Sequence, residues 1–225
     1  MTATIIFTGP SLAIPGARPP AAVGDVLAAA RERGVKRIAI IDGYFERMAA
    51  VWHKEILIAL ERGIAVYGAA SMGALRAAEL APFGMIGVGA IYRDFAAGRL
   101  VADDEVAIAH LPAEAGYRAV SDALVNLRYG LAKAARARVI SARTAKALVE
   151  LARSRFYRER SWAQLVADGN VAKLPARELA ALAAWPKPDR KADDARLLLK
   201  RLATDPIVRP PKLRVPRTWA LRQLG

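Results

Sequence analysis

The sequence predicts an α/β protein with an open, mainly parallel Rossmann-like sheet flanked by helices, followed by an all-helical C-terminal region. In the first 80 residues, short apolar runs rich in β-branched residues alternate with helical segments. Glycines at 34 and 63 follow the first two helical segments, where a chain commonly leaves a helix. From residue 121 onward the pattern is helical throughout.

The first half alternates strands and helices. Strands are expected at 4–8, 37–41 and 64–67, with short ones at 85–88 and 106–110. Helices are expected at 26–33, 49–62, 72–80 and 91–97. Parallel strands joined in this way require right-handed crossovers, with the helices packed against the sheet.

The second half reads as a series of helices ending in a proline-rich tail. The helices are expected at 122–139, 141–157, 161–169, 176–184 and 189–202, with serines or a proline at several starts. The tail has four prolines interleaved with Arg and Lys, which is typical of an extended arm that is ordered only when it docks on a partner or another subunit. We therefore divide the chain into an α/β core (1–118), a basic helical region (119–204) and an arm (205–225).

Charge is distributed unevenly. Residues 1–110 contain equal numbers of basic and acidic side chains, so the whole net charge of +14 lies in residues 111–225. This asymmetry indicates an acidic partner, such as a protein, a peptide or a nucleic acid. Solvent-facing helices in an arginine-rich chain explain it equally well.

Composition excludes several classes of chemistry. The chain has no cysteine, so it has no disulfide, thiolate nucleophile or cysteine-bound zinc, which fits a cytoplasmic location. Only His53 and His110 supply imidazoles, and we expect no metal site. No apolar run is long enough for a membrane span, and no signal peptide is expected at the N-terminus. Dinucleotide and Walker A sequences are absent, so no cofactor is expected.

Small and polar residues follow each of the first three strands. These are Gly9-Pro10-Ser11, Asp42-Gly43 and Ala70-Ser71. Because the carboxyl ends of parallel strands meet at one edge of a sheet, the three turns should lie together. Ligands of open α/β sheets bind at this edge.

Ser71 stands at the corner between the third strand and the next helix. Residues 69–73 (AASMG) differ from the nucleophile turn G-x-S-x-G only in Ala69. Ser71 could be a nucleophile on a sharp turn, a group that helps the helix start to hold an anion, or an ordinary helix N-cap. The sequence leaves these three interpretations open.

A nucleophilic Ser71 would need a base and a group to orient that base. His53 is one candidate base and His110 the alternative, with Asp42 as the orienting acid. The backbone N–H groups of Met72 and Gly73 would then serve as an oxyanion hole. His53 could equally be a packed, hydrogen-bonded histidine.

The anion-binding interpretation needs fewer groups. Ser11 and Ser71 would hold a carboxylate or phosphate, and Arg76 would supply the counter-charge. The groove that would receive this group consists of small residues and the helix start, namely Gly68, Ala70, Met72 and Gly73. The plain alternative for Arg76 is an ion pair with Glu79 within the helix.

The acidic run at residues 103–105 has two interpretations. Three adjacent carboxylates could bind a divalent cation, but on a surface loop they are usually just solvated.

Several segments together resemble the TfuA-like family. These are residues 7–11 (FTGPS), 41–45 (IDGYF), 51–57 (VWHKEIL), 68–80 (GAASMGALRAAEL) and 103–106 (DDEV). The resemblance covers roughly residues 4–130. It implies a partner of a YcaO enzyme, which uses ATP to activate a peptide backbone amide so that sulfur can be installed as a thioamide.

Two roles follow from that resemblance. In the first, the chain hydrolyses a thiocarboxylated sulfur-carrier protein and releases sulfide to YcaO, which modifies a ribosomally made precursor peptide. Because the chain has no cysteine for a persulfide, sulfur must pass as a carrier-bound or free species. In the second, the chain recruits or activates YcaO or the peptide without chemistry of its own. A homo-oligomer stays open, and no nucleic-acid motif is found.

Overall fold

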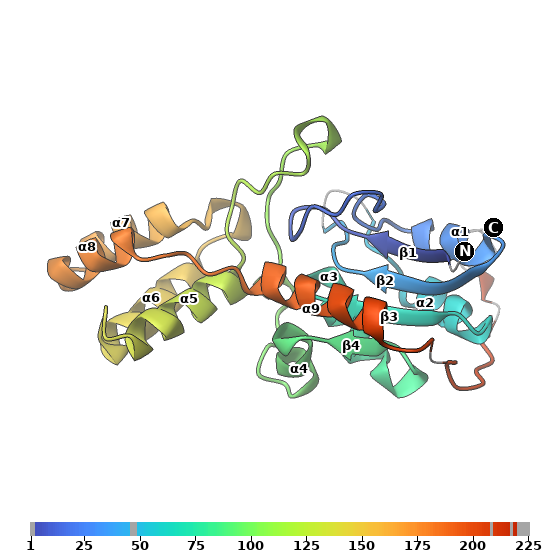
Figure 1. Ribbon diagram of the computed structural model, residues 1–225. Coiled ribbons are helices and arrows are strands. Elements are labelled where there is room, and N and C mark those ends of the chain that lie inside the picture. The colour runs from blue at the N-terminus through green and yellow to red at the C-terminus, as the bar shows by residue number, and fades with distance from the viewer. Residues whose placement is uncertain (1–2, 46–48, 208, 217, 220–225) are drawn as a thin grey trace. The chain divides into compact units, whose positions relative to one another are not determined.

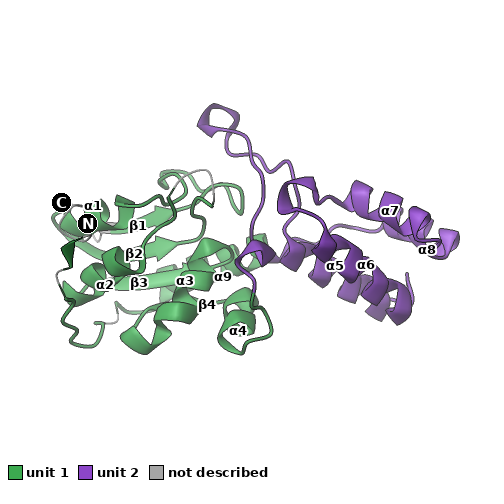
Figure 2. Ribbon diagram, turned by 180° about the vertical axis from the view of Figure 1, so that it is seen from behind, with its two compact units in different colours: residues 1–101, 191–225 green, residues 102–190 purple. Residues whose placement is uncertain are grey.

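The computed structural model describes residues 3–45, 49–207, 209–216 and 218–219 of the chain. It divides into two compact units (Figure 2). Unit 1 comprises residues 1–101 and 191–225, and unit 2 comprises residues 102–190.

Unit 1 is built on a four-stranded parallel sheet, which confirms the predicted α/β class. Its strands are β1 (Ala3–Phe7), β2 (Val35–Ile40), β3 (Ala65–Ala69) and β4 (Ile86–Val88). They lie in the order β1-β2-β3-β4, and every neighbouring pair is parallel. All five residues of β3 are buried, as expected of a central parallel strand.

Helices cover both faces of this sheet (Figure 1). The crossover helices are α1 (Asp25–Arg31), α2 (His53–Glu61) and α3 (Met72–Leu80), followed by η1 (Ala81–Phe83) and α4 (Ala90–Ala96). Right-handed crossovers between strands in sequential order put α1, α2 and α3 on one face, where they share a single apolar core with β1, β2 and β3. The opposite face is covered by α9 (Arg190–Thr204).

The last helix and the arm belong to unit 1, although the sequence division placed residues up to 204 in a helical region. Ala195, Leu198 and Leu202 of α9 pack with Ala39 and Tyr67 of the sheet. The physical reason is the one-sided arrangement of the crossovers, which leaves one apolar sheet face that another helix must bury.

The arm docks on its own unit, whereas the sequence predicted order only on a partner or another subunit. Val215 is buried in a small cluster with Leu27 of α1 and Ile58 of α2. Its N–H donates to Glu61 Oε1 at 2.8 Å. Apolar contacts and this bond therefore hold the arm against the helices of unit 1.

Two predicted elements differ in the structure. The helix expected from residue 49 begins at His53, because Glu55 Oε1 accepts the Trp52 N–H at 2.7 Å and caps the helix there; residues 46–48 lie outside the described part. The strand expected at 106–110 was wrong, because the described part of unit 2 offers this segment only a single bridge, between His110 and Ala119.

Unit 2 is helical, with helices near their predicted positions. They are α5 (Leu124–Arg136), α6 (Ala142–Ser154), α7 (Trp162–Val171) and α8 (Ala176–Ala184), together with the short 3-10 turns η2 (Asp103–Glu105), η3 (Ala113–Ala115) and η4 (Tyr157–Glu159). The hydroxyls of Ser141 and Ser161 cap α6 and α7 by accepting N–H groups of the first turn, at 3.2 and 3.1 Å. Leucines of all four helices share one core.

The acidic run at residues 103–105 has arginine partners in unit 2. Arg160, which is almost fully buried, donates to Asp104 Oδ2 at 2.5 Å. Arg128 forms a two-pronged pair with the buried Glu105, at 2.8 and 3.0 Å. Two of the three carboxylates therefore form ion pairs with arginines of unit 2, and these pairs stabilise the fold of that unit.

Candidate functional site

The three polar turns predicted from the sequence lie at one edge of the sheet in unit 1. Ile40 of β2 pairs with Gly68 of β3, and Asp42 and Ser71 follow these residues where the two strands end. The turn that contains Ser11 follows β1, on the other side of β2. Neighbouring strand ends therefore carry all three groups.

Asp42 is the centre of a hydrogen-bond network at this edge. Its side chain is 2% exposed. Ser11 Oγ donates to Asp42 Oδ1 at 2.6 Å, and the N–H groups of Gly9 and Ser11 donate to Oδ2 at 2.9 and 3.0 Å. Lys191 Nζ lies 4.0 Å from Oδ1. The carboxylate thus holds the turn after β1 and faces one buried cation.

Ser71 leaves β3 through a strained turn. Ala70 has a φ of 64°, and the Ser71 N–H donates to the Ala69 carbonyl at 2.7 Å, which closes a three-residue γ-turn. Holding a non-glycine residue in this region costs about 1–3 kcal/mol, and such strain clusters at functional sites. The Ser71 hydroxyl accepts no N–H of the first turn of α3, unlike the capping serines of α6 and α7. The ordinary N-cap interpretation is therefore wrong for its side chain.

Two glycines allow α3 to begin directly against the sheet. A Cβ on Gly73 would lie 1.7 Å from the Ile40 carbonyl oxygen, and one on Gly68 would lie 2.0 Å from the Gly73 carbonyl oxygen. The Gly73 N–H donates to the Ile41 carbonyl at 3.3 Å. This N–H, expected with that of Met72 to form an oxyanion hole, is thus hydrogen-bonded to the residue that follows β2.

His53 and Arg76 both bind Glu79. His53 Nε2 and Arg76 Nη1 each lie 2.7 Å from Glu79 Oε2, and Arg76 Nε donates to the Val51 carbonyl at 3.0 Å. Glu79 follows Ser71 by eight residues, about 12 Å along the axis of α3. The structure therefore joins His53 to the last turns of α3 rather than to Ser71, and confirms the ion pair of Arg76 within the helix.

His110, the alternative base, belongs to unit 2. Its Nδ1 lies 2.8 Å from the Leu111 carbonyl oxygen, and its ring packs edge-on against Tyr117 with centroids 5.8 Å apart. These contacts fix the imidazole within its own unit. Its role as a base stays a prediction, as does the series Asp42, His53 and Ser71.

Sequence reasoning missed two buried charged residues on α9. Lys191 and Asp194 are 2% and 3% exposed, and Asp194 Oδ2 accepts the Ile91 N–H at 2.8 Å at the start of α4. The sequence does contain a pattern that indicates the burial of Lys191, because this residue shares one helical stripe with Ala195 and Leu198. A lysine on an apolar stripe indicates a buried charge with a partner.

Glu55 is a further buried carboxylate that the sequence reasoning did not single out. Its Oε2 accepts the N–H groups of Gly24, Val26 and Leu27 at 3.1–3.3 Å, and its Oε1 caps α2. Burial raises the pKa of Glu55, and the backbone hydrogen bonds oppose that rise. One carboxylate therefore ties the starts of α1 and α2 together.

The described part of the chain contains neither a cluster of metal-binding side chains nor a helix that could span a membrane. No three His, Asp or Glu side chains there come together as a group that could hold a metal ion. No described helix combines the length and apolar character needed to cross a bilayer.

The fold and the edge define unit 1 as a parallel α/β unit whose strand ends carry a strained serine turn and a buried acid–lysine pair. The family model for TfuA-like protein matches residues 42–161, more than half of the chain. The chain therefore belongs to the TfuA-like family. No curated protein matches it. Family membership indicates involvement in YcaO-type thioamidation. The match contains Asp42, His53 and Ser71, whereas Ser11 and Lys191 lie outside it.

Proposed function

We propose that this protein supplies sulfur to a YcaO enzyme by hydrolysing a thiocarboxylated sulfur-carrier protein, with Ser71 as the nucleophile. The observation that carries the proposal is the strained turn that presents Ser71 at the carboxyl edge of the sheet while its hydroxyl does not cap α3. Membership of the TfuA-like family supports YcaO-type thioamidation as the pathway in which this reaction takes place.

The neighbourhood of Ser71 suits an acyl-sulfur group on a slender peptide. Gly68, Ala70 and Gly73 are buried, and the two glycines pack against backbone, so the turn that carries Ser71 is compact. A sulfur carrier ends in a flexible Gly-Gly tail, whose lack of side chains suits a close approach to such a turn. Its thiocarboxylate is an anion, and the start of a helix favours negative charge.

The reaction divides into acylation and hydrolysis. Ser71 Oγ forms a bond to the thiocarboxylate carbon while the carbon–sulfur bond breaks, and the hydroxyl proton ends on the departing sulfur as hydrosulfide. Water then cleaves the serine ester, which gives the carrier carboxylate and restores the hydroxyl. YcaO would use the released sulfide on the activated amide of the precursor peptide.

The test incubates the protein with the thiocarboxylated carrier and measures sulfide together with the intact mass of the carrier. We expect stoichiometric sulfide and a carrier carboxylate from wild type, and neither from Ser71→Ala. Ser154→Ala, at an exposed serine that ends α6, is the matched control and should react as wild type. Full release by Ser71→Ala would refute the nucleophile.

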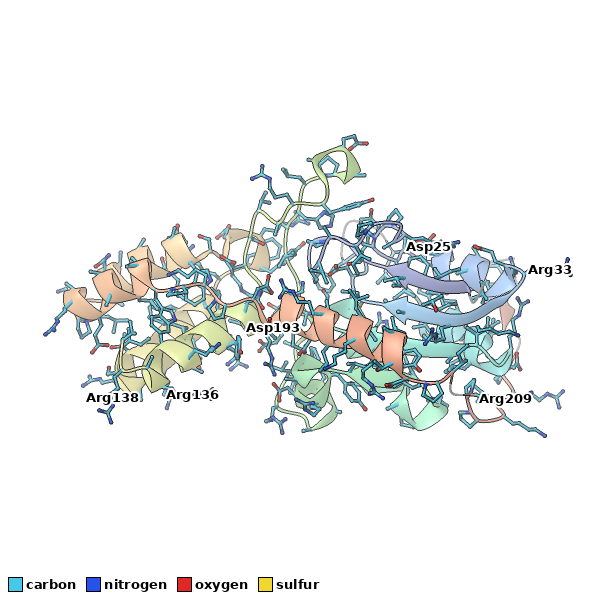
Figure 3. The ribbon with its side chains drawn as sticks, in the orientation of Figure 1. Asp25, Arg33, Arg136, Arg138, Asp193 and Arg209 are labelled. Atoms are coloured by element: carbon cyan, nitrogen blue, oxygen red, sulfur yellow. The ribbon has the colours of Figure 1, made fainter. Side chains whose placement is uncertain are left out.

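A second candidate function, recruitment or activation of YcaO without chemistry, rests on a basic surface of unit 2. Exposed cations that have no acidic partner among the described contacts stand on α5 and α6 and at the turn between them: Arg136, Arg138, Arg143, Lys146 and Arg153. Figure 3 shows Arg136 and Arg138 at the C-terminal end of α5. Such a surface is suited to an acidic partner.

Charge reversal separates the two functions. Arg143, Lys146 and Arg153 share one face of α6, whereas Arg155 forms an ion pair with Asp168 and would disturb the fold if reversed. An adaptor requires that the three reversals abolish binding to YcaO while Ser71→Ala still supports thioamidation. Lys200→Glu, at an exposed position of α9 in unit 1, is the control. Binding that resists both reversal and salt argues against the adaptor.

A further inference from the structure

Two helix–helix turns of unit 2 share one backbone conformation. After α5, the N–H groups of Arg138 and Val139 donate to carbonyls near the end of that helix, at 3.0 and 2.9 Å. After α7, the N–H groups of Lys173 and Leu174 make the same pair of bonds, at 3.0 and 2.9 Å. Both turns are therefore Schellman motifs, in which a residue in the left-handed conformation ends the helix.

A cation occupies the left-handed position of each turn. The φ angles of Arg138 and Lys173 are 59° and 55°. Glycine takes this conformation without steric cost and is the usual residue there. Elsewhere this chain does use glycine, as at Gly63 after α2 and Gly98 after α4. Two charged side chains thus stand where glycine would fit the backbone better, which indicates that they serve a purpose other than folding.

The two turns lie at the same end of the helical unit. Ser141, which caps α6 after the first turn, donates its N–H and its hydroxyl to Glu178 Oε2 at 2.9 and 3.1 Å. Glu178 belongs to the first turn of α8, which follows the second turn. Residues 136–146 and 172–178 therefore form one surface, the cationic tip of unit 2. Figure 3 shows Arg136 and Arg138 at this end.

The cationic tip carries six exposed cations and one carboxylate. The carboxylate is that of Glu178, which already accepts the two hydrogen bonds from Ser141. None of the six cations forms an ion pair with an acidic side chain among the described residues. They are Arg136, Arg138, Arg143, Lys146, Lys173 and Arg177. Such a concentration of one charge attracts an anionic partner.

The composition of the cationic tip favours a flexible partner. Neither of its two segments contains an aromatic residue. Interfaces between folded proteins are centred on buried aromatic and other large anchors, and single-stranded nucleic acid is held by aromatic rings on which its bases stack. An unfolded peptide rich in carboxylates needs no such ring, because complementary charge is sufficient to attract it.

We propose that the cationic tip binds an acidic segment of an unfolded peptide, which in the pathway proposed above is the precursor peptide that YcaO modifies. The inference rests on the proposed function for the identity of the peptide, whereas the binding itself follows from the charges of the tip. One protein then holds the peptide and also releases the sulfide that YcaO installs in it.

The test replaces Arg138 and Lys173 together by glycine. Because glycine fits both turns, this double variant should melt at least as high as wild type, so that a loss of binding cannot come from unfolding. The probe is a fluorescent peptide of about 20 residues, which spans about 66 Å when extended, with glutamate at every second position. We expect the double variant to bind it about tenfold more weakly or worse, and salt to weaken binding by wild type.

Two controls separate charge from other effects. Exchanging the two cations, Arg138→Lys with Lys173→Arg, keeps the charge and should keep the affinity. Arg118→Ala removes an exposed cation of unit 2 outside the tip and should bind as wild type. If the glycine variant proves less stable than wild type, Arg136→Gln with Arg177→Gln, at exposed helical positions, gives the same comparison.

Three results would overturn the inference. The first is equal binding by the double glycine variant and by Arg118→Ala. The second is equal binding of a peptide that has glutamine in place of every glutamate. The third is tighter binding of a single-stranded RNA of the same length, which would assign the tip to nucleic acid.

The outcomes are independent of the proposed hydrolysis, because the binding assay contains no thiocarboxylate. The double glycine variant should release sulfide from the carrier as wild type does. In the coupled reaction with YcaO it should need about tenfold more precursor peptide for half-maximal thioamidation, and an unchanged requirement would overturn the assignment to that peptide. Peptide binding without sulfide release refutes hydrolysis alone, and sulfide release without peptide binding refutes this inference alone.

Discussion

The buried pair of Asp42 and Lys191 makes a prediction about stability that does not depend on the reaction. Two unit charges 4.0 Å apart attract by about 4 kcal/mol at an effective dielectric constant near 20. Asp42→Asn should retain the bonds to Gly9 and Ser11, because an amide oxygen can accept both N–H groups while the amide nitrogen donates to the hydroxyl. This substitution therefore removes mainly the charge, and Lys191→Met removes the opposite one.

A double-mutant cycle measures the interaction of the pair. Each single substitution leaves one buried charge without its partner and should lower the free energy of unfolding by about 3–5 kcal/mol. The double variant should lose less than the sum, with a coupling of about 1–3 kcal/mol. Urea denaturation followed by circular dichroism gives the four values.

The same cycle with Lys200→Met in place of Lys191→Met is the control. Lys200 is exposed, and its substitution should add to that of Asp42→Asn. If the cycle of Asp42 and Lys191 is also additive within about 0.5 kcal/mol, the two residues do not interact, and the positioning of Lys191 by charge is refuted.

Three further predictions concern the frame of unit 1. Gly73→Ala should cost more than the roughly 1–3 kcal/mol typical of overpacking, because its Cβ would lie 1.7 Å from the Ile40 oxygen; an unchanged melting temperature would contradict this. Burial raises the pKa of Glu55 above its ordinary 4.5, so unfolded chains release that proton at a lower pH than folded ones. The stability of wild type relative to Glu55→Gln should therefore fall as pH rises from 4.5 through the raised pKa, as melting curves across pH would show, and a constant difference would argue against it. Val215→Asp should release the arm from α1 and α2 and speed its cleavage by trypsin; equal rates would mean that the arm is held by other contacts.

Sequence patterns predicted those strands and helices whose formation depends mainly on the composition of the segment itself. The apolar runs of β1, β2 and β3 and the helix after Ser71 were predicted because buried strands and helix formers have distinct compositions. The alternation of strands and helices predicted a parallel sheet, but it did not predict the order of the strands. The shared edge of Ser11, Asp42 and Ser71 could be inferred before any coordinate was known, because parallel strands end together.

Other features depend on tertiary partners that no local pattern contains. The stretch from 106 to 110 alternates like a strand, but a strand forms only where a neighbour offers hydrogen bonds. The start of α2 was missed because Glu55 caps Trp52 from inside the helix. The partner of His53 is Glu79, which lies 26 residues away, so its spacing from Ser71 in sequence said nothing about their separation.

The position of α9 on the sheet could not be predicted either, because it depends on a tertiary contact. Its stripe of Ala195, Leu198 and Leu202 shows that one face is buried, but not which surface buries it. The sheet face left open by the one-sided crossovers decides that question. This placement brings Lys191 to Asp42 at the ends of the strands.

If this protein hydrolyses a thiocarboxylate, an oxygen atom from water must enter the carrier, and an isotope measurement detects that atom. The thiocarboxylated carrier is treated with the protein in water enriched in oxygen-18, and the intact mass of the carrier is recorded beside the sulfide released. Hydrolysis through Ser71 predicts one heavy oxygen in the carrier carboxylate for each sulfide, and no incorporation above the rate without protein for Ser71→Ala. Sulfide released without heavy oxygen, or a carrier that keeps its sulfur, would rule out hydrolysis by this protein.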